Sequence, residues 1–273
     1  MLPTVIIVGL IGILVGGVVN LLADSLPRQR KVSFPPRYPD GSPRPPIAWL
    51  GITAFLFGKR LDPSGNKLRW RYPLTELLTA GLMIMTILVI SDDPAMTPLQ
   101  LIFWLTYMAI FSLITVIDLE HRLILFIEII PACAIAILDA ATTSYGARLS
   151  DALIGGAVGF AVFFIMYLGG FLFIYVMART RGRSTNEVAF GYGDVMLITL
   201  SGLILGWQPL IPAIFLTVFL GALGAVAWIV GRWFTGNRYS LFTPLPYGQY
   251  IVIATIIMLL FSPEVTRFLR QPA

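Results

Sequence analysis

Long apolar runs, separated by short polar stretches, make up most of the 273-residue chain. A helix that crosses the hydrocarbon core of a bilayer needs about 20 mostly apolar residues. The pattern therefore predicts an all-α polytopic membrane protein with about eight transmembrane helices. These predicted helices cover residues 3–25, 73–91, 98–117, 123–141, 151–177, 194–207, 209–230 and 246–262.

One sizeable loop, residues 27–72, separates the first two predicted helices. It is rich in proline, which interrupts regular helix, so we expect a small irregular cytoplasmic subdomain with a short amphipathic piece near residues 49–57. The alternative is a disordered basic linker that lies on anionic lipid. We thus expect three parts, which are a first transmembrane helix (1–26), this basic Pro-rich loop, and a membrane core (73–273).

The composition agrees with a membrane protein. The chain is 57% hydrophobic and 12% charged, with a mean hydropathy of +0.84, whereas soluble domains carry about 25% charged residues. No basic residue precedes the apolar segment 1–23, so this segment is expected to be a retained helix and not a cleaved signal peptide. Cys133 is the single cysteine and is expected to be a packing residue, and with one histidine, His121, the chain offers no Cys/His cluster for a metal.

The basic residues predict an orientation. In the predicted topology, 16 of the 19 Lys and Arg residues fall on the side of loop 27–72, and the other three are Arg148, Arg267 and Arg270. Basic loops face the cytoplasm, so both termini are expected outside, and Asp118 and Asp194 are expected at the cytoplasmic face. The net charge of +5 is therefore explained by membrane orientation, and no nucleic-acid partner is expected.

Two acids at the ends of predicted helices are the candidate catalytic residues. Asp118 follows the run 98–117, and Asp194 follows Gly191-Tyr192-Gly193 at the start of 194–207. A charge in such a place is costly unless it is paired, hydrated or functional. Two carboxylates held close together in a low dielectric cannot both ionise, so one can act as a base on water and the other as an acid. We therefore predict an aspartyl protease dyad.

Structural alternatives exist for each acid. Asp118 is soon followed by Glu120, His121 and Arg122 and could be an ordinary solvated turn residue. Asp194 could be the N-cap of the helix that follows it. Other acids within predicted helices compete with this pair. Glu76 could support the site or contact a substrate, although a structural role is favoured for it. The remaining acids of this kind are Glu128 and Asp139.

Several blocks along nearly the whole chain resemble the bacterial type IV prepilin peptidases, which are aspartyl proteases of the Gly-x-Gly-Asp group. The block Arg71-Tyr72-Pro73-Leu74-Thr75-Glu76-Leu77-Leu78-Thr79 is the most specific of them. The others are residues 16–20 with 25–27, residues 116–124 around the first aspartate, residues 191–195 around the second, and residues 245–248.

The resemblance implies a membrane aspartic endopeptidase with Asp118 and Asp194 as the catalytic pair. Its substrate would be a prepilin or pseudopilin within the plasma (inner) membrane, cut after a glycine on the cytoplasmic side. Many members of the family also methylate the new N-terminus with S-adenosylmethionine, so the resemblance implies this second activity. No residues of this chain can be assigned to the cofactor. The alternatives are a peptidase without methyl transfer and a transporter with a carboxylate proton relay.

Three departures from the family pattern stand out. Many members carry two Cys-x-x-Cys pairs in the first loop, which resemble a zinc site, but residues 27–72 contain no cysteine, so zinc is not expected. Leu125-Phe126 stands where the family often has Pro-Asp or Pro-Asn, and Met196 stands where it often has lysine. The last two departures concern contacts with the substrate, and they leave both aspartates in place.

The rival functions explain less of the sequence. A transporter of this kind is expected to show broken helices from an internal repeat, and no repeat is evident. An inactive scaffold of the secretion machinery would not need both aspartates. An archaeal preflagellin peptidase usually lacks the long first loop and the Arg-Tyr-Pro block. The peptidase is therefore the favoured function.

Overall fold

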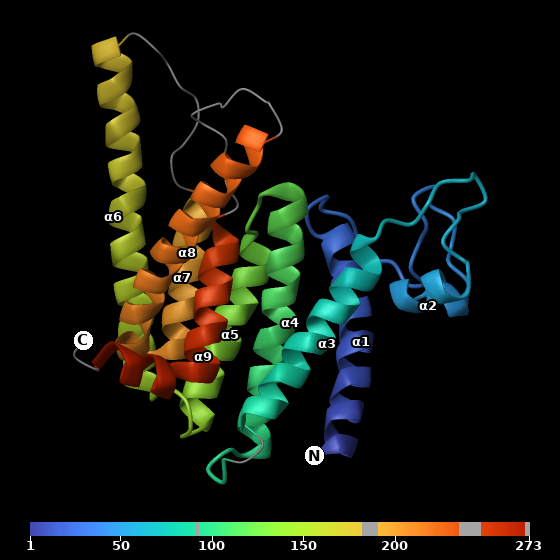
Figure 1. The fold of residues 1–273 in the computed structure, drawn as a ribbon, viewed down its shortest axis with the longest axis horizontal. Coiled ribbons are helices and arrows are strands. Elements are labelled where there is room, and N and C mark those ends of the chain that lie inside the picture. Colours follow the sequence, from blue (N-terminus) through green and yellow to red (C-terminus); the bar gives the residue numbers. More distant parts are fainter. Residues whose placement is uncertain (91–92, 182–190, 235–246, 271–273) are drawn as a thin grey trace. The chain divides into compact units, whose positions relative to one another are not determined.

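The computed structural model describes residues 1–90, 93–181, 191–234 and 247–270, which are almost entirely helical (Figure 1). Each of the eight predicted helices coincides with one long helix, which confirms the all-α polytopic fold. The elements are α1 (Leu2–Ser25), η1 (Pro46–Ala48), α2 (Gly51–Leu56), α3 (Arg71–Ile90), α4 (Pro98–His121), α5 (Phe126–Thr142), α6 (Leu149–Arg181), α7 (Tyr192–Leu205), α8 (Trp207–Phe234) and α9 (Gly248–Arg270).

Five of the described helices are long and apolar enough to cross a membrane, namely α1, α3, α4, α8 and the part of α6 from Leu149 to Leu172. Two shorter apolar helices are α7 and the Gly248–Ser262 part of α9. The chain divides into two compact units, Met1–Leu123 and Ile124–Ala273. The three-part division expected from the sequence stays a prediction.

In the first unit, α1 and α3 pack as an antiparallel pair through small residues. A side chain at Gly12 would place its Cβ 2.6 Å from Ala80 Cα, and one at Gly16 would place it 2.5 Å from Glu76 Cα. In these two contacts the residue number rises along α1 while it falls along α3, so the helices are antiparallel. Small residues allow membrane helices to approach this closely, so the two glycines fix which turn of α1 faces which turn of α3.

The loop between α1 and α3 folds into an ordered subdomain. Its core consists of Tyr38, Ala48, Ala54 and Leu68. The Tyr38 hydroxyl donates to the Lys59 carbonyl oxygen at 2.6 Å and ties the two halves of the loop together. The structure therefore does not support the alternative of a disordered linker. The helical piece expected near residues 49–57 is present as α2, which directly follows η1.

In the second unit, α7 packs against α5, α6, α8 and α9. Its inward residues are fully buried, for example Leu197 and Leu200. The hydroxyl groups of Ser201 on α7 and Thr255 on α9 lie 2.7 Å apart and hydrogen-bond inside this core. The surrounding helices thus hold the short helix α7 on several sides, and this packing fixes the position of its first turn.

Candidate active site

Asp118 lies in the last turn of α4 and is only 5% exposed. The helix ends at Arg122, which adopts a left-handed conformation (φ 54°) and donates its N–H to the Asp118 carbonyl oxygen at 2.8 Å. The alternative of a solvated turn residue is therefore wrong. A carboxylate in the last turn also faces the negative end of the helix dipole, so Asp118 is placed where it does not stabilise its own helix.

Asp194 is the third residue of α7 and is half-buried. The N-cap is Gly191, whose carbonyl oxygen accepts the Asp194 N–H at 3.1 Å, so the N-cap alternative for Asp194 is wrong. An acid in the first turn faces the positive end of the helix dipole, which favours its charged form. This position is the electrostatic opposite of the position that Asp118 occupies on α4.

The second glycine of the Gly-x-Gly-Asp turn is required by packing. A Cβ at Gly193 would lie 2.8 Å from the Cβ of Ile124, in the segment that leads into α5. On the other side of the turn, the Tyr192 ring lies 5.8 Å from the Phe126 ring and 5.5 Å from the Tyr167 ring. The first turn of α7 is therefore clamped between α5 and α6.

Sequence reasoning assigned no role to Tyr247, which the structure brings to this end of α7. The charge of the Asp194 carboxylate acts on the Tyr247 phenol. The phenol ring packs on α8 at Gly221, where a Cβ would lie 2.9 Å from Tyr247 Cε2. Tyr247 belongs to the block 245–248 that resembles the family, which was the signal for this residue in the sequence. Leu245 and Pro246 lie outside the described residues, as does Phe190, which precedes the Gly-x-Gly-Asp turn.

The other acids differ in their surroundings. Asp139 accepts a hydrogen bond from the Thr143 hydroxyl at 2.7 Å in the last turn of α5, at the far end of that helix. Glu128 is buried in the first turn of α5, two residues from the Phe126 ring that contacts Tyr192. Glu128 therefore lies at the same end of its unit as Asp194 and remains a competitor within the candidate site.

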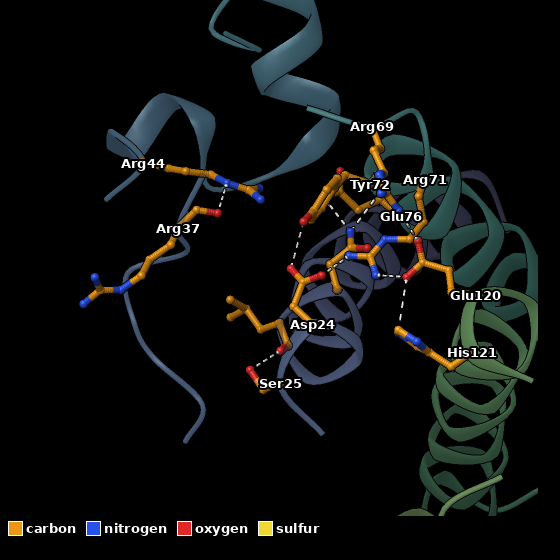
Figure 2. Close-up of polar contacts among 12 residues, drawn as sticks. Asp24, Ser25, Arg37, Arg44, Arg69, Arg71, Tyr72, Glu76, Glu120 and His121 are labelled. Carbon is orange, nitrogen blue, oxygen red and sulfur yellow. Dashed lines mark hydrogen bonds and ion pairs between the residues drawn. The ribbon is translucent and has the colours of Figure 1, made fainter. Parts of the chain in front are cut away.

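An ion-pair network holds the end of α4 that carries Asp118 (Figure 2). The guanidinium of Arg71, at the start of α3, contacts Asp24 of α1 at 2.6 Å and Glu120 of α4 at 2.7 Å. The Tyr72 hydroxyl donates to the other Asp24 oxygen at 2.9 Å. The Arg-Tyr pair thus joins three helices two residues from Asp118, and nothing in the spacing of the residues predicted these partners.

Glu76, from the same block, has a structural role. It is fully buried, and its carboxylate accepts the N–H groups of Gly51 at 2.5 Å and Ile52 at 2.8 Å. The Asn20 amide lies 3.4 Å from the same carboxylate and donates more closely, at 3.0 Å, to the Tyr72 carbonyl oxygen. Glu76 therefore fastens the loop subdomain to α3, and it is not placed to activate water.

Among the described residues, no group of three or more His, Cys, Asp or Glu side chains could hold a metal ion. Hydrogen bonds and stacking hold the loop. The Arg44 side chain is buried, donates to the Arg37 carbonyl oxygen at 2.9 Å and lies 4.3 Å from the centre of the Tyr72 ring. The Asp62 carboxylate accepts the N–H of Asn66 at 2.6 Å.

We predict that the peptidase activity will be insensitive to EDTA and that the purified protein will carry no stoichiometric zinc. The reason is that a zinc-held loop gains much of its folding free energy from the metal, whereas this loop has no thiolate or histidine ligand. Cleavage assays with and without EDTA, with elemental analysis, check this. A loss of activity in EDTA that added zinc restores would contradict it.

A cavity of about 350 Å³ in the second unit lies away from Asp194. Gly206 and Trp207, which follow the end of α7, line it, together with Arg148 and Asp151 near the start of α6. Asp194 sits at the opposite end of α7. The cavity is therefore not part of the candidate active site.

The fold is that of a polytopic membrane protein, with a Gly-x-Gly-Asp turn at the start of a buried helix. Residues 99–226, which include Asp118 and Asp194, match the Type IV leader peptidase family. This part of the chain is therefore similar to type IV leader peptidases. Its pairing of Asp118 with Asp194 stays a prediction, because the two residues belong to different units.

The chain is also similar to curated proteins named prepilin leader peptidase/N-methyltransferase. The Aeromonas salmonicida protein is 29% identical over 224 residues, which cover 82% of this chain and 68% of that relative. The Bacillus subtilis protein is 28% identical over 229 residues, with 82% and 79% covered. The Pseudomonas aeruginosa protein is 30% identical over 200 residues, with 72% and 60% covered. No solved structure matches the chain significantly.

Proposed function

We propose that this protein is a membrane aspartic endopeptidase that removes the leader from type IV prepilins or pseudopilins. The observation that carries the proposal is the match of residues 99–226, with both aspartates inside it, to the Type IV leader peptidase family. The relatives' names support prepilins as the substrate class. The transporter alternative is not favoured by any of these similarities.

In the proposed mechanism, the two aspartates divide the acid and base roles according to their helix positions. Asp194, at the positive end of the α7 dipole, acts as the ionised base, and Asp118, buried at the negative end of the α4 dipole, holds the proton. Asp194 takes a proton from water, and the water oxygen bonds to the scissile carbonyl carbon. Asp118 donates to the carbonyl oxygen, and the C–N bond then breaks as a proton reaches the leaving amine.

The proposed location is the bacterial inner membrane, with cleavage on the cytoplasmic side after a glycine. The strong bias of Lys and Arg toward one side of the predicted topology supports this orientation. Of the basic residues counted in that bias, Arg183 and Arg238 lie outside the described residues.

Fusions of a topology reporter should show this orientation. We expect a reporter inserted within 27–72 to read cytoplasmic, and reporters fused after Pro94 or at Ala273 to read external, because basic loops stay inside. Paired alkaline phosphatase and fluorescent-protein fusions provide the measurement. If the loop and Ala273 read the same side, the predicted number of spans is wrong by one.

We also infer that the protein methylates the N-terminus that cleavage creates. The relatives' names include N-methyltransferase activity, and S-adenosylmethionine is the proposed donor. When bound, this donor would supply the methyl group to the new amine, which would lose a proton as the demethylated donor leaves. No residue of the chain is assigned to the donor.

One experiment tests both activities. The purified protein in lipid is incubated with a prepilin that carries glycine before phenylalanine, with and without S-adenosylmethionine, and the product is analysed by mass spectrometry. We expect a new N-terminus directly after the glycine, and one added methyl group when the donor is present. Complete cleavage without the methyl group would restrict the protein to the peptidase, and absence of any cleavage would contradict the proposed function.

A further inference from the structure

The loop subdomain contains an uncharged segment, residues 45–57, which is followed by Gly58 and then by the basic residues Lys59 and Arg60. It forms η1 and α2, and Thr53 is its most polar side chain. An uncharged run of this length is unusual for a loop that lies in water, and it is too short to cross a membrane. The depth of the segment along the neighbouring helices therefore indicates whether it lies in water or in lipid.

The contacts of this segment place it beside α1 and α3, well inside their ends. A Cβ at Gly17 would meet the Leu50 side chain at 2.6 Å, and Gly17 lies eight residues before the end of α1 at Ser25. At 1.5 Å per residue this is about 12 Å along the helix. Glu76, which binds Gly51, lies about 8 Å inside the start of α3 by the same measure. Figure 1 shows α2 beside α1 and not beyond its end.

This depth lies within the hydrocarbon layer of a bilayer that α1 crosses. The 24 residues of α1 are about 36 Å long, and the hydrocarbon core is about 30 Å thick. A centred α1 therefore extends only about 3 Å beyond the core on each side. The start of α2 then lies roughly 9 Å below the surface of that core, on the side where α1 ends.

The outward side chains of α2 suit such a place. Leu56 is 76% exposed and Phe57 is 60% exposed, although neither is polar. Leu14 of α1 and Leu77 of α3 are likewise exposed apolar side chains, at 59% and 56%. Apolar side chains that protrude in this way are unfavourable in water, whereas lipid chains cover them at no such cost. The spans α1 and α3 already face lipid with the same kind of surface.

Two backbone donors and the indole donor of the segment have acceptors within the protein. The first N–H groups of a helix have no partner within it, and unsatisfied backbone groups are costly in hydrocarbon. The Glu76 carboxylate accepts two of these groups, from Gly51 and Ile52. The indole N–H of Trp49 donates to the Arg44 carbonyl oxygen at 3.1 Å. In water, solvent would satisfy these donors without a buried carboxylate.

We propose that residues 46–57 form a re-entrant element within one bilayer leaflet, with Leu56 and Phe57 in contact with lipid acyl chains. The occupant of this surface is lipid, because the contacts at Gly17 and Glu76 place the segment within the length of α1 that crosses the hydrocarbon core. Exposed Lys59, two residues after Phe57, reaches the headgroups, where basic residues are favoured. The element holds the loop subdomain against the membrane surface.

Spin labels test the proposal in the full-length protein. In a Cys133→Ala background, which has no other cysteine, single substitutions Leu56→Cys and Phe57→Cys are labelled and reconstituted in vesicles of phosphatidylethanolamine and phosphatidylglycerol. Leu14→Cys provides the lipid-facing reference, and Ser64→Cys, in an exposed turn, provides the water-facing reference. Collision rates with oxygen, which concentrates in lipid, and with a water-soluble nickel chelate are measured by power saturation.

The expected result is that labels at 56 and 57 group with the Leu14 reference, with high oxygen and low nickel collision rates. Grouping with Ser64 would overturn the proposal, because α2 would then lie in water. Low rates with both reagents would also overturn it, because protein, such as a second copy of the chain, would then cover the surface. A matching elution profile for every labelled variant shows that the fold is retained.

Discussion

Asp118→Asn and Asp194→Asn will each abolish leader cleavage and leave the protein inserted in the membrane. We expect the turnover rate to fall by about 10⁴-fold, at the upper end of what one positioned acid or base contributes. Each change removes a group that the other carboxyl needs, since water activation requires one charged and one neutral partner. Cleavage of a matched prepilin by the purified variants, followed by mass spectrometry, provides the measurement.

Two further variants make this test specific. Asp151→Asn, at the opposite end of the second unit from Asp194, should cleave at the normal rate. Glu128→Gln removes the competing buried acid near the start of α7. If Glu128→Gln abolished cleavage and Asp118→Asn did not, the pairing of Asp118 with Asp194 would be wrong, and Glu128 would take the place of Asp118.

Glu76→Ala will lower the stability of the first unit far more than it lowers the rate of the chemical step. The change leaves the N–H groups of buried Gly51 and part-buried Ile52 without their acceptor. Each unsatisfied group costs about 1–3 kcal/mol, so we expect a loss of about 2–6 kcal/mol. Glu76→Gln keeps one oxygen, so it should lose about half as much and show a milder loss of activity than either aspartate variant.

Thermal unfolding in detergent and limited proteolysis of the loop measure this effect. Thr79→Ala is the matched control, because Thr79 is equally buried one turn along α3 and its hydroxyl donates to the Thr75 carbonyl oxygen of the same helix. We expect the loop of Glu76→Ala to be cut fastest. An unchanged melting temperature together with a complete loss of cleavage would instead place Glu76 in the chemistry.

Hydropathy predicted the helices well and their ends less well, and the ends carry the candidate site. The helix expected to stop at 117 continues to His121, because its stop depends on the left-handed Arg122 and not on polarity. The helix expected to start at Asp194 starts at Tyr192, because Gly191 is the N-cap. The first shift placed Asp118 in the last turn of a helix, and the second placed Asp194 third in its helix and not first.

The long-range partners of Arg71 and Glu76 could not be predicted from the sequence. Nothing in the spacing of Arg71 indicated that it would join Asp24 and Glu120, which lie 47 and 49 residues away. The partners of Glu76 in the loop depend on how that loop folds back on α3. By contrast, the small residues Gly12 and Gly16, four positions apart on one face of α1, were a readable signal for close helix packing.

The glycines where α6 and α7 cross have a mechanical consequence. A Cβ at Gly155 would collide with the carbonyl oxygen of Gly202, and a Cβ at Gly202 would collide with that of Gly155. Backbone therefore rests on backbone, and no layer of side chains is available to deform or repack. The crossing is a rigid contact between the two helices, about 12 Å along α7 from Asp194. Since the first turn of α7 is also held by α5 and α6, α7 cannot slide along α6, and Asp194 moves only if both helices move together.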